Sequence, residues 1–321
     1  MKLLVTGAAG FIGSHLAETL LRQGDEVIGL DNFNNYYDPA RKRSNMAPFR
    51  DHPRFTFYEA DIRDADRMRQ IITNHHPGVI AHIAAMASVR YSIGRAPLYT
   101  DVNLRGTVNL LEAARGIGVP HFVFASTSSV YGKTDRIPFE ESDPCNHPLA
   151  PYPATKKACE MMGYTYHNLH GLNFTALRFF SVYGPRGRPD MMPFMVMHRI
   201  VNDQEIQLFE AGQMKRDWTY ADDIIAGVVA ATDRPLGYEI INLGRGEPVL
   251  MADFVKIIED LVGKRAILST PPAPPSEPKI NYADINKARK LLDYDPKTAV
   301  ADGLAQMWDW YRREILSYGN G

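Results

Sequence analysis

A tyrosine and a lysine stand four residues apart in the segment Tyr152-Pro153-Ala154-Thr155-Lys156. At the start of a helical stretch, this spacing puts both side chains on one face of the helix. A tyrosine with a pKa of about 10 is a poor base at neutral pH, but a nearby ammonium favours the phenolate and lowers that pKa. Such a pair can exchange a proton with an alcohol, although the same spacing also occurs in ordinary surface pairs.

Hydroxyl side chains precede this pair in Ser126-Thr127-Ser128-Ser129, directly after the apolar run Phe122–Ala125. The carboxyl ends of parallel strands are where α/β sheets assemble their active sites, so we expect these hydroxyls to face a ligand. A serine-rich turn without a ligand is the alternative. The position of the run between a glycine-rich loop and Tyr152 favours donors to a bound sugar.

Glycines at positions 7, 10 and 13 lie between an apolar run and a helical stretch. Glycine permits a tight turn and close backbone approach, and the N-terminus of the following helix attracts a pyrophosphate. Asp31 ends the next apolar run, where a carboxylate accepts from a ribose diol and repels a 2′-phosphate. The pattern therefore predicts a dinucleotide site that prefers NAD over NADP, rather than a glycine-rich turn without a ligand.

Short β-branched runs alternate with amphipathic stretches up to about Arg178, which predicts βαβ units. The expected strands are near-continuously apolar, as in a parallel sheet covered by helices on both faces. They are Leu3–Thr6, Val27–Leu30, Phe55–Tyr58, Val79–Ile83, Phe122–Ala125 and Asn173–Leu177. The expected fold is α/β, a Rossmann-type doubly wound parallel sheet.

The alternation breaks after Arg178 into proline-punctuated, methionine-rich sequence. We therefore expect an NAD-binding domain over residues 1–178 and a smaller α/β substrate-binding subdomain over 179–321. A helix at Asp222–Thr232 and a strand at Glu239–Asn242 look like pieces returning to the first sheet, so segments near 217–243 should interleave the two.

Composition excludes several functional classes. The 321 residues are 45% hydrophobic and 23% charged with a net charge of -1, so no basic field exists to hold nucleic acid or a membrane surface. Cys145 and Cys159 form neither a CxxC pair nor a disulfide framework, which argues against a cysteine-ligated zinc and fits a reducing compartment; no metal site is expected. With no apolar stretch near ~20 residues and no signal-peptide start, the cytoplasm is expected.

Taken together, the glycine pattern, the Thr127 run, Tyr-x-x-x-Lys and the segment from Arg216 to Ile224 resemble the extended short-chain dehydrogenase/reductase family. Two segments, 31–39 and 187–193, are similar to the UDP-glucuronate 4-epimerases in particular. The resemblance covers nearly the whole chain. It implies NAD-dependent epimerisation of UDP-glucuronate to UDP-galacturonate through a 4-keto intermediate, in a homodimer formed through helices near Pro97–Arg115 and Tyr152–His170.

The resemblance also implies roles for individual residues. Tyr152 would accept and return the proton, Lys156 would tune it and bind the nicotinamide ribose, and Thr127 would hydrogen-bond the reacting oxygen. Arg216 would pair with the diphosphate. The implied cofactor contacts are Gly7, Gly10, Phe11, Ile12, Gly13, Asp31, Asn32, Asp61, Ile62, Ala84, Ala85 and Asn103, together with Tyr152 and Lys156.

Oxidising C4 of a glucuronate makes a β-keto acid that tends to lose CO2, so the carboxylate must be held. We expect Thr127, Ser128, Ser129, Ser181 and Arg188 around it, with Arg186 as a near-equal competitor to Arg188. A 4,6-dehydratase would carry Asp-Glu where this chain has Ser128-Ser129. The open alternatives are a UDP-glucose/galactose-type 4-epimerase, a UDP-glucuronate decarboxylase and, in a different class, a non-catalytic dinucleotide sensor.

Overall fold

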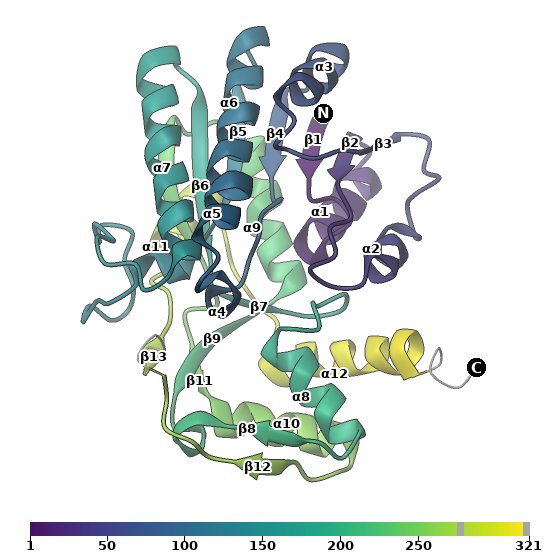
Figure 1. Ribbon diagram of the computed structural model, residues 1–321, viewed down its shortest axis with the longest axis vertical. Helices are drawn as coiled ribbons and strands as arrows, with labels where there is room; N and C mark the ends of the chain where they lie inside the picture. Colours follow the sequence, from purple (N-terminus) through teal and green to yellow (C-terminus); the bar gives the residue numbers. More distant parts are fainter. Residues whose placement is uncertain (275–278, 317–321) are drawn as a thin grey trace.

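A seven-stranded parallel sheet forms the centre of the larger lobe of the protein (Figure 1). The computed structural model describes residues 1–274 and 279–316. In spatial order the strands are β10 (Tyr238–Leu243), β6 (Asn173–Phe179), β5 (His121–Thr127), β4 (Val79–His82), β1 (Lys2–Thr6), β2 (Glu26–Asp31) and β3 (Phe55–Glu59). The chain reverses its direction of progress across the sheet at β1. The predicted Rossmann-type α/β class is thereby confirmed.

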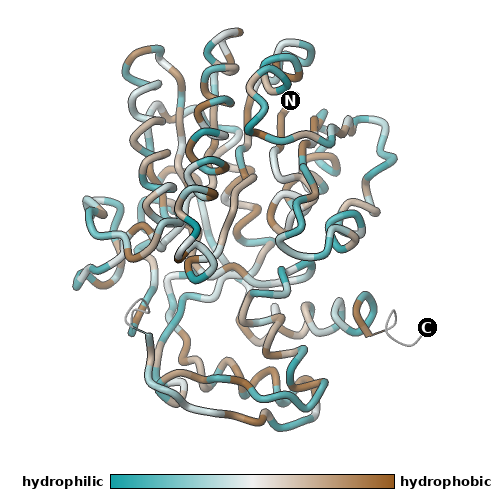
Figure 2. The backbone as a smooth tube through the Cα atoms, viewed as in Figure 1, coloured by the Kyte–Doolittle hydropathy of each residue, from teal (hydrophilic) through white to brown (hydrophobic). Residues whose placement is uncertain are grey.

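Helices cover both faces of this sheet because its strands are apolar on both sides. Along β1, Leu3 and Val5 point into the core on one face and Leu4 into the core on the other. One face is covered by α1 (Phe11–Arg22), α9 (Ala221–Asp233) and α11 (Asn286–Leu292), the other by α3 (Ala65–His75), α6 (Gly106–Ile117) and α7 (Pro151–His170). In Figure 2, hydrophobic residues, drawn in brown, are frequent along the backbone in the region of the large sheet.

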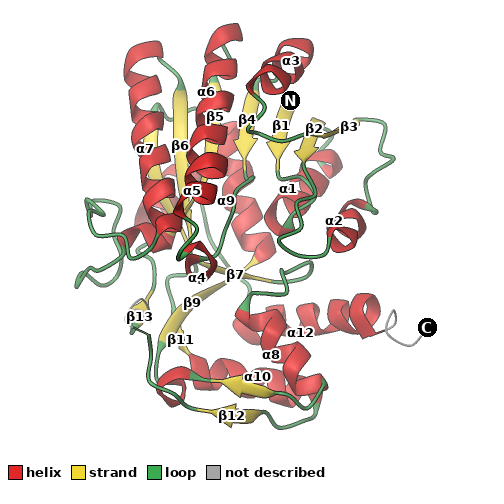
Figure 3. Ribbon diagram, in the orientation of Figure 1, coloured by secondary structure: helices red, strands yellow, loops and turns green. Residues whose placement is uncertain are grey.

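A smaller lobe follows β6 and has its own core, which includes Trp218, Phe254 and Leu304. Its strands are short: β7 (Ser181–Tyr183), β8 (Glu205–Gln207), β9 (Lys215–Tyr220), β11 (Pro248–Leu250), β12 (Ile267–Ser269) and β13 (Ile280–Asn281). Its helices are α8 (Met192–Val201), α10 (Met251–Val262) and α12 (Val300–Tyr311). The strands of the large sheet point their carboxyl ends toward this lobe (Figure 3).

All six predicted strands of the first half are present in the structure, most of them one or two residues longer than predicted. Within the stretch expected to return near 217–243, α9 and β10 lie on the large sheet, whereas β9 lies in the smaller one. Three short helices follow β2 and β4 along the chain: α2 (Pro39–Met46) after β2, and α4 (Val89–Ser92) and α5 (Ala96–Tyr99) after β4. Among the described residues, no helix is long and apolar enough to cross a membrane.

Candidate active site

The turn between β1 and α1 leaves no room for side chains at two of its glycines. Gly7 has a φ of +71°, and a Cβ there would lie 2.9 Å from the backbone nitrogen of Ala84. A Cβ on Gly13 would lie 2.0 Å from the carbonyl oxygen of Gly7. Gly10 is the N-cap residue of α1, and the first N–H groups of a helix have no partner within it. This bare backbone cradle fits the pyrophosphate of a dinucleotide.

Asp31 lies beside this turn at the end of β2. Its carboxylate accepts from the backbone N–H groups of Ala9, at 3.2 Å, and Phe33, at 2.9 Å. Burial raises the pKa of Asp31, and the positive charge of Lys42 acts in the opposite direction. Lys42 donates to the backbone and side-chain oxygens of Asn34, at 2.9 and 3.1 Å. Asp31 lines the cavity, and its contact with a cofactor ribose stays a prediction.

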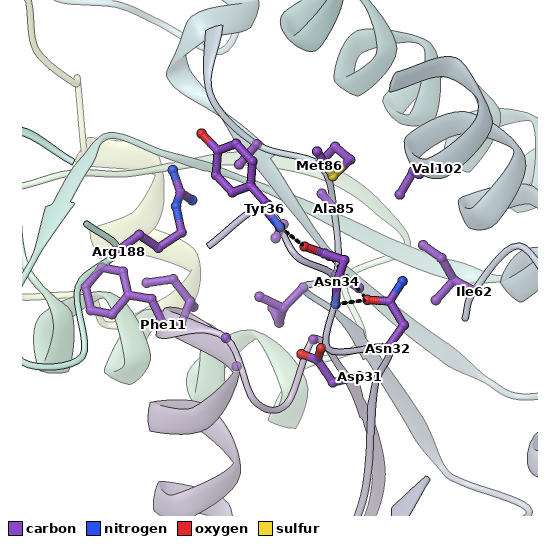
Figure 4. A pocket seen from close by; sticks show the side chains of 18 of the residues that line it. Phe11, Asp31, Asn32, Asn34, Tyr36, Ile62, Ala85, Met86, Val102 and Arg188 are labelled. Atoms are coloured by element: carbon purple, nitrogen blue, oxygen red, sulfur yellow. Dashed lines mark hydrogen bonds between the residues drawn. The ribbon is translucent and has the colours of Figure 1, made fainter. Parts of the chain in front are cut away.

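One cavity is lined by both the glycine turn and Tyr152. Figure 4 shows part of its lining, including Asp31, Tyr36 and Arg188. The predicted residues that line it are Gly7, Gly10, Phe11, Ile12, Gly13, Asp31, Asn32, Ile62, Ala84, Ala85, Tyr152, Lys156 and Arg188. They come from six separate stretches of chain at the carboxyl edge of the sheet. The structure therefore places the predicted cofactor cradle and the predicted proton-transfer pair in one cavity.

Tyr152 and Lys156 lie in the first turns of α7, on the face directed at β5. Burial raises the pKa of Tyr152, while polar contact with Thr127 and the charge of Arg188 act to lower it. The ammonium of Lys156 donates to the carbonyl oxygen of Ala125 at 2.7 Å, and burial lowers its pKa to about 8. The groups that favour the Tyr152 phenolate are thus Thr127 and Arg188, and Lys156 is held by the strand instead.

The hydroxyl run ends β5 as predicted and continues into a tight turn. The Thr127 hydroxyl accepts from the backbone N–H of Ser129 at 3.1 Å, and Thr127 and Ser128 are both buried. Ser126 lines the cavity and donates to the carboxylate of Glu160 at 2.7 Å. This contact fixes the end of β5 against α7, next to Tyr152.

The two competing arginines lie in different surroundings. Arg188 lines the cavity and is close enough to Tyr152 for its charge to act on the phenol. Arg186 instead donates to Glu18 of α1 at 2.6 Å, outside the cavity lining. The geometry therefore favours Arg188 over Arg186 as the partner of a ligand carboxylate.

The remaining predicted contacts lie behind or beyond the cavity wall. Asp61 accepts from the amide of Asn32 at 2.8 Å and from Arg63, and Asn103 holds the backbone of Met86. Both support lining residues from behind, and their predicted cofactor contacts stay predictions. Ser181 begins β7 and pairs with Trp218 of β9, the strand that carries Arg216. The roles of Ser129, Ser181 and Arg216 in substrate binding also stay predictions.

Sequence reasoning left several lining residues unassigned. Asn34, Tyr36 and Tyr37 also line the cavity. They lie in segment 31–39, which carried the resemblance, but no individual role was predicted for them from the sequence. Lys42 also lines the cavity, from a helix whose sequence carries no distinct signal. Within residues 1–274 and 279–316, no cluster of three or more histidine, cysteine or acidic side chains is arranged to hold a metal ion.

Comparison with known proteins places this geometry in a family. Residues 3–244 match the NAD dependent epimerase/dehydratase family. A UDP-glucuronate 4-epimerase of Thermodesulfobacterium geofontis is 41% identical over 97% of this chain and 96% of its own length. A crystal structure of a UDP-glucuronic acid 4-epimerase from Bacillus cereus, in complex with UDP-glucuronic acid and NAD, is 37% identical with a TM-score of 0.91, covering 98% of this chain and 99% of that one.

The fold alone does not distinguish the activities within this family. A dTDP-glucose 4,6-dehydratase from Streptomyces venezuelae also superposes with a TM-score of 0.91, at 32% identity, covering 99% of this chain and 98% of that one. The distinction must come from individual residues, such as Ser128-Ser129, where a 4,6-dehydratase is expected to carry Asp-Glu. The chain belongs to the NAD dependent epimerase/dehydratase family.

Proposed function

We propose that this protein converts UDP-glucuronate to UDP-galacturonate by NAD-dependent epimerisation at C4. The observation that carries the proposal is one cavity in which a dinucleotide cradle, Tyr152 and Arg188 meet. The relatives in Thermodesulfobacterium geofontis and Bacillus cereus, which are UDP-glucuronate 4-epimerases, support the choice of substrate. Ser128-Ser129, where a 4,6-dehydratase is expected to carry Asp-Glu, argues against dehydration.

The chain's own residues supply proton transfer and orientation. When bound, NAD supplies the hydride acceptor and donor for C4. Tyr152 takes the proton of the 4-hydroxyl. It returns that proton to the 4-keto oxygen after the sugar has rotated to present the opposite face of C4. Thr127 hydrogen-bonds that oxygen, and Lys156 binds the nicotinamide ribose beside Tyr152.

The sugar carboxylate is held so that the 4-keto intermediate keeps its CO2. Thr127, Ser128, Ser129 and Ser181 offer neutral donors, and Arg188 supplies the positive charge. A guanidinium suits this task because its planar fork matches a carboxylate. Arg216 is assigned to the diphosphate.

Product analysis tests the proposal directly. Purified protein is incubated with UDP-glucuronate and the nucleotide sugars are separated by chromatography. UDP-galacturonate is the expected product. Formation of a UDP-pentose would show that the protein is a decarboxylase. Absence of turnover would favour the non-catalytic dinucleotide sensor.

Substitution of Arg188 tests the carboxylate assignment. Arg188→Ala should weaken the selection of UDP-glucuronate over UDP-glucose by about tenfold or more, because a charge-assisted hydrogen bond is lost. Arg186→Ala is the matched control, since Arg186 pairs with Glu18 outside the cavity lining. Selectivity that survives Arg188→Ala would place the carboxylate elsewhere.

We propose further that the protein is a cytoplasmic homodimer, with a cofactor-binding domain over residues 1–178 and a substrate-binding subdomain over 179–321. Exposed apolar side chains on α7 support the dimer, since Met161, Tyr164 and Leu169 are 63%, 54% and 65% exposed. Sedimentation of the wild type and of Met161→Glu tests it. A dimer that the charge dissociates is expected, and a wild-type monomer would overturn this part of the proposal.

A further inference from the structure

Arg188 is already held by a carboxylate of the protein itself. Its Nε and Nη2 atoms donate to the two oxygens of Asp190, at 2.9 and 3.1 Å. Burial alone would raise the pKa of Asp190, but the hydrogen bonds and charge of Arg188 keep it below its usual value. The pair is therefore a bidentate ion pair that fixes one edge of the guanidinium.

The opposite edge of Arg188 is available to a ligand. Among residues 1–274 and 279–316, no hydrogen bond is made by Nη1 of Arg188. The side chain lines the cavity and points toward Tyr36 in Figure 4. Asp190 thus determines which edge of the guanidinium a substrate carboxylate meets.

Asp190 is in turn fixed by Tyr36, a residue of the segment between β2 and α2. The hydroxyl of Tyr36 donates to Oδ2 of Asp190 at 2.8 Å, and the Arg188 guanidinium lies 5.9 Å from the centre of the Tyr36 ring. The ring of Tyr36 also packs edge-on against Tyr91, with ring centres 4.8 Å apart. Tyr36 therefore has a fixed position from which to hold Asp190.

Tyr36 ends a chain of hydrogen bonds that begins at the cofactor cradle. Asn32, next to Asp31, donates to Asp61 at 2.8 Å and accepts from the backbone N–H of Asn34 at 3.0 Å. The side-chain oxygen of Asn34 accepts from the backbone N–H of Tyr36 at 3.1 Å, as Figure 4 shows. An unbroken series of contacts thus joins the ribose-binding end of the cavity to Arg188.

We propose that Tyr36 and Asp190 are positioning residues for carboxylate selection, which orient Arg188 and link its orientation to the cofactor-binding segment. The inference rests on the proposed function, because it assigns Arg188 to the carboxylate of the sugar. A ligand that engages Arg188 and a cofactor that contacts Asp31 and Asn32 then favour each other, and this coupling acts in both directions. UDP-glucose lacks the carboxylate, so its binding is not coupled to cofactor binding through Arg188.

Two conservative variants test the proposal on the NAD-loaded protein. Tyr36→Phe removes one oxygen and Asp190→Asn removes one charge. Each should raise the KM for UDP-glucuronate about tenfold, with a smaller change in kcat and little change in the dissociation constant of UDP-glucose. Tyr166→Phe is the matched control, because Tyr166 also donates to a carboxylate, that of Glu112, outside the cavity lining.

Cofactor exchange provides a readout that a merely structural role would not move. Exchange of bound NAD against a fluorescent analogue should be slowed more by UDP-glucuronate than by UDP-glucose in the wild type. Tyr36→Phe and Asp190→Asn should abolish that difference. Variants that keep both the wild-type KM and the wild-type difference would overturn the inference, whereas a wild type that does not turn over UDP-glucuronate would overturn the proposed function instead.

Discussion

The surroundings of Tyr152 oppose its ionisation in the free protein. Burial raises its pKa, and the groups that lower it are Thr127 and Arg188. Lys156 is occupied by the carbonyl oxygen of Ala125. The proton exchange that we propose for this phenol therefore depends on bound ligands and on these two neighbours.

Replacing Tyr152 isolates this proton transfer. Tyr152→Phe should lower kcat by roughly 100-fold or more, the usual contribution of a positioned acid or base, while thermal stability and NAD affinity stay near those of the wild type. Steady-state kinetics and a melting curve measure both properties. Tyr164→Phe, an exposed residue of the same helix, is the control and should keep wild-type turnover; wild-type turnover in Tyr152→Phe would discard the assignment.

Motifs identified residues that line the cavity better than residues that hold the lining in place. Tyr152, Lys156, Asp31 and the glycines were predictable because each has a chemical reason at a fixed spacing. No role was predicted for Asp190 from the sequence. Its contact with Tyr36 joins residues that are distant in sequence and meet only in the folded protein.

At the scale of elements, the turn between β1 and α1 depends on backbone packing. Gly13→Ala would place a Cβ 2.0 Å from the Gly7 carbonyl oxygen, so the turn must shift. We expect a loss of about 1–3 kcal/mol in the free energy of unfolding and weakened NAD binding. Urea denaturation and NAD titration measure the two effects.

Gly116→Ala provides the matched control for that substitution. Gly116 lies in α6, and a Cβ there meets nothing within 4 Å. The exchange should stabilise the protein by about 0.5–1 kcal/mol, because alanine favours the helix. Equal effects of the two substitutions would contradict the close approach of α1 to the Gly7 carbonyl.

A buried ion pair joins α7 to the sheet behind Tyr152. Arg178 of β6 donates to Glu160 of α7 at 3.0 and 2.9 Å, and both side chains are 0% exposed. Glu160→Gln should cost about 3–5 kcal/mol, because it leaves the Arg178 charge buried without its partner. Asp66→Asn, in an exposed pair with Arg69, is the control and should change stability by less than about 0.5 kcal/mol.

The same pair predicts a pH dependence. Burial opposes ionisation of Glu160, but the hydrogen bond and charge of Arg178 outweigh it and lower its pKa below 4.5. Its contribution to stability is therefore complete above pH 4.5 and is lost as the pH falls through the lower pKa of the folded state. The stability difference between the wild type and Glu160→Gln should shrink over that acidic range; a constant difference would contradict the ion pair.

Strands of the large sheet were predictable because burial on both faces requires continuous apolar runs. The strands of the smaller lobe, such as β8 and β13, have only two or three residues and no such run. The Glu160–Arg178 pair also escaped prediction, since nothing in the spacing of the two residues indicates contact. Tertiary pairing, rather than local pattern, creates these features.

Over the whole molecule, the large sheet provides the cofactor cradle and the segment after β6 brings Arg188 to it. The central claim is that one hydrogen leaves C4 of the sugar as hydride and returns to the same carbon. UDP-glucuronate labelled with deuterium at C4 tests this claim when the product is examined by NMR. The account predicts UDP-galacturonate that retains the deuterium at C4, whereas replacement of the label by solvent hydrogen would contradict it.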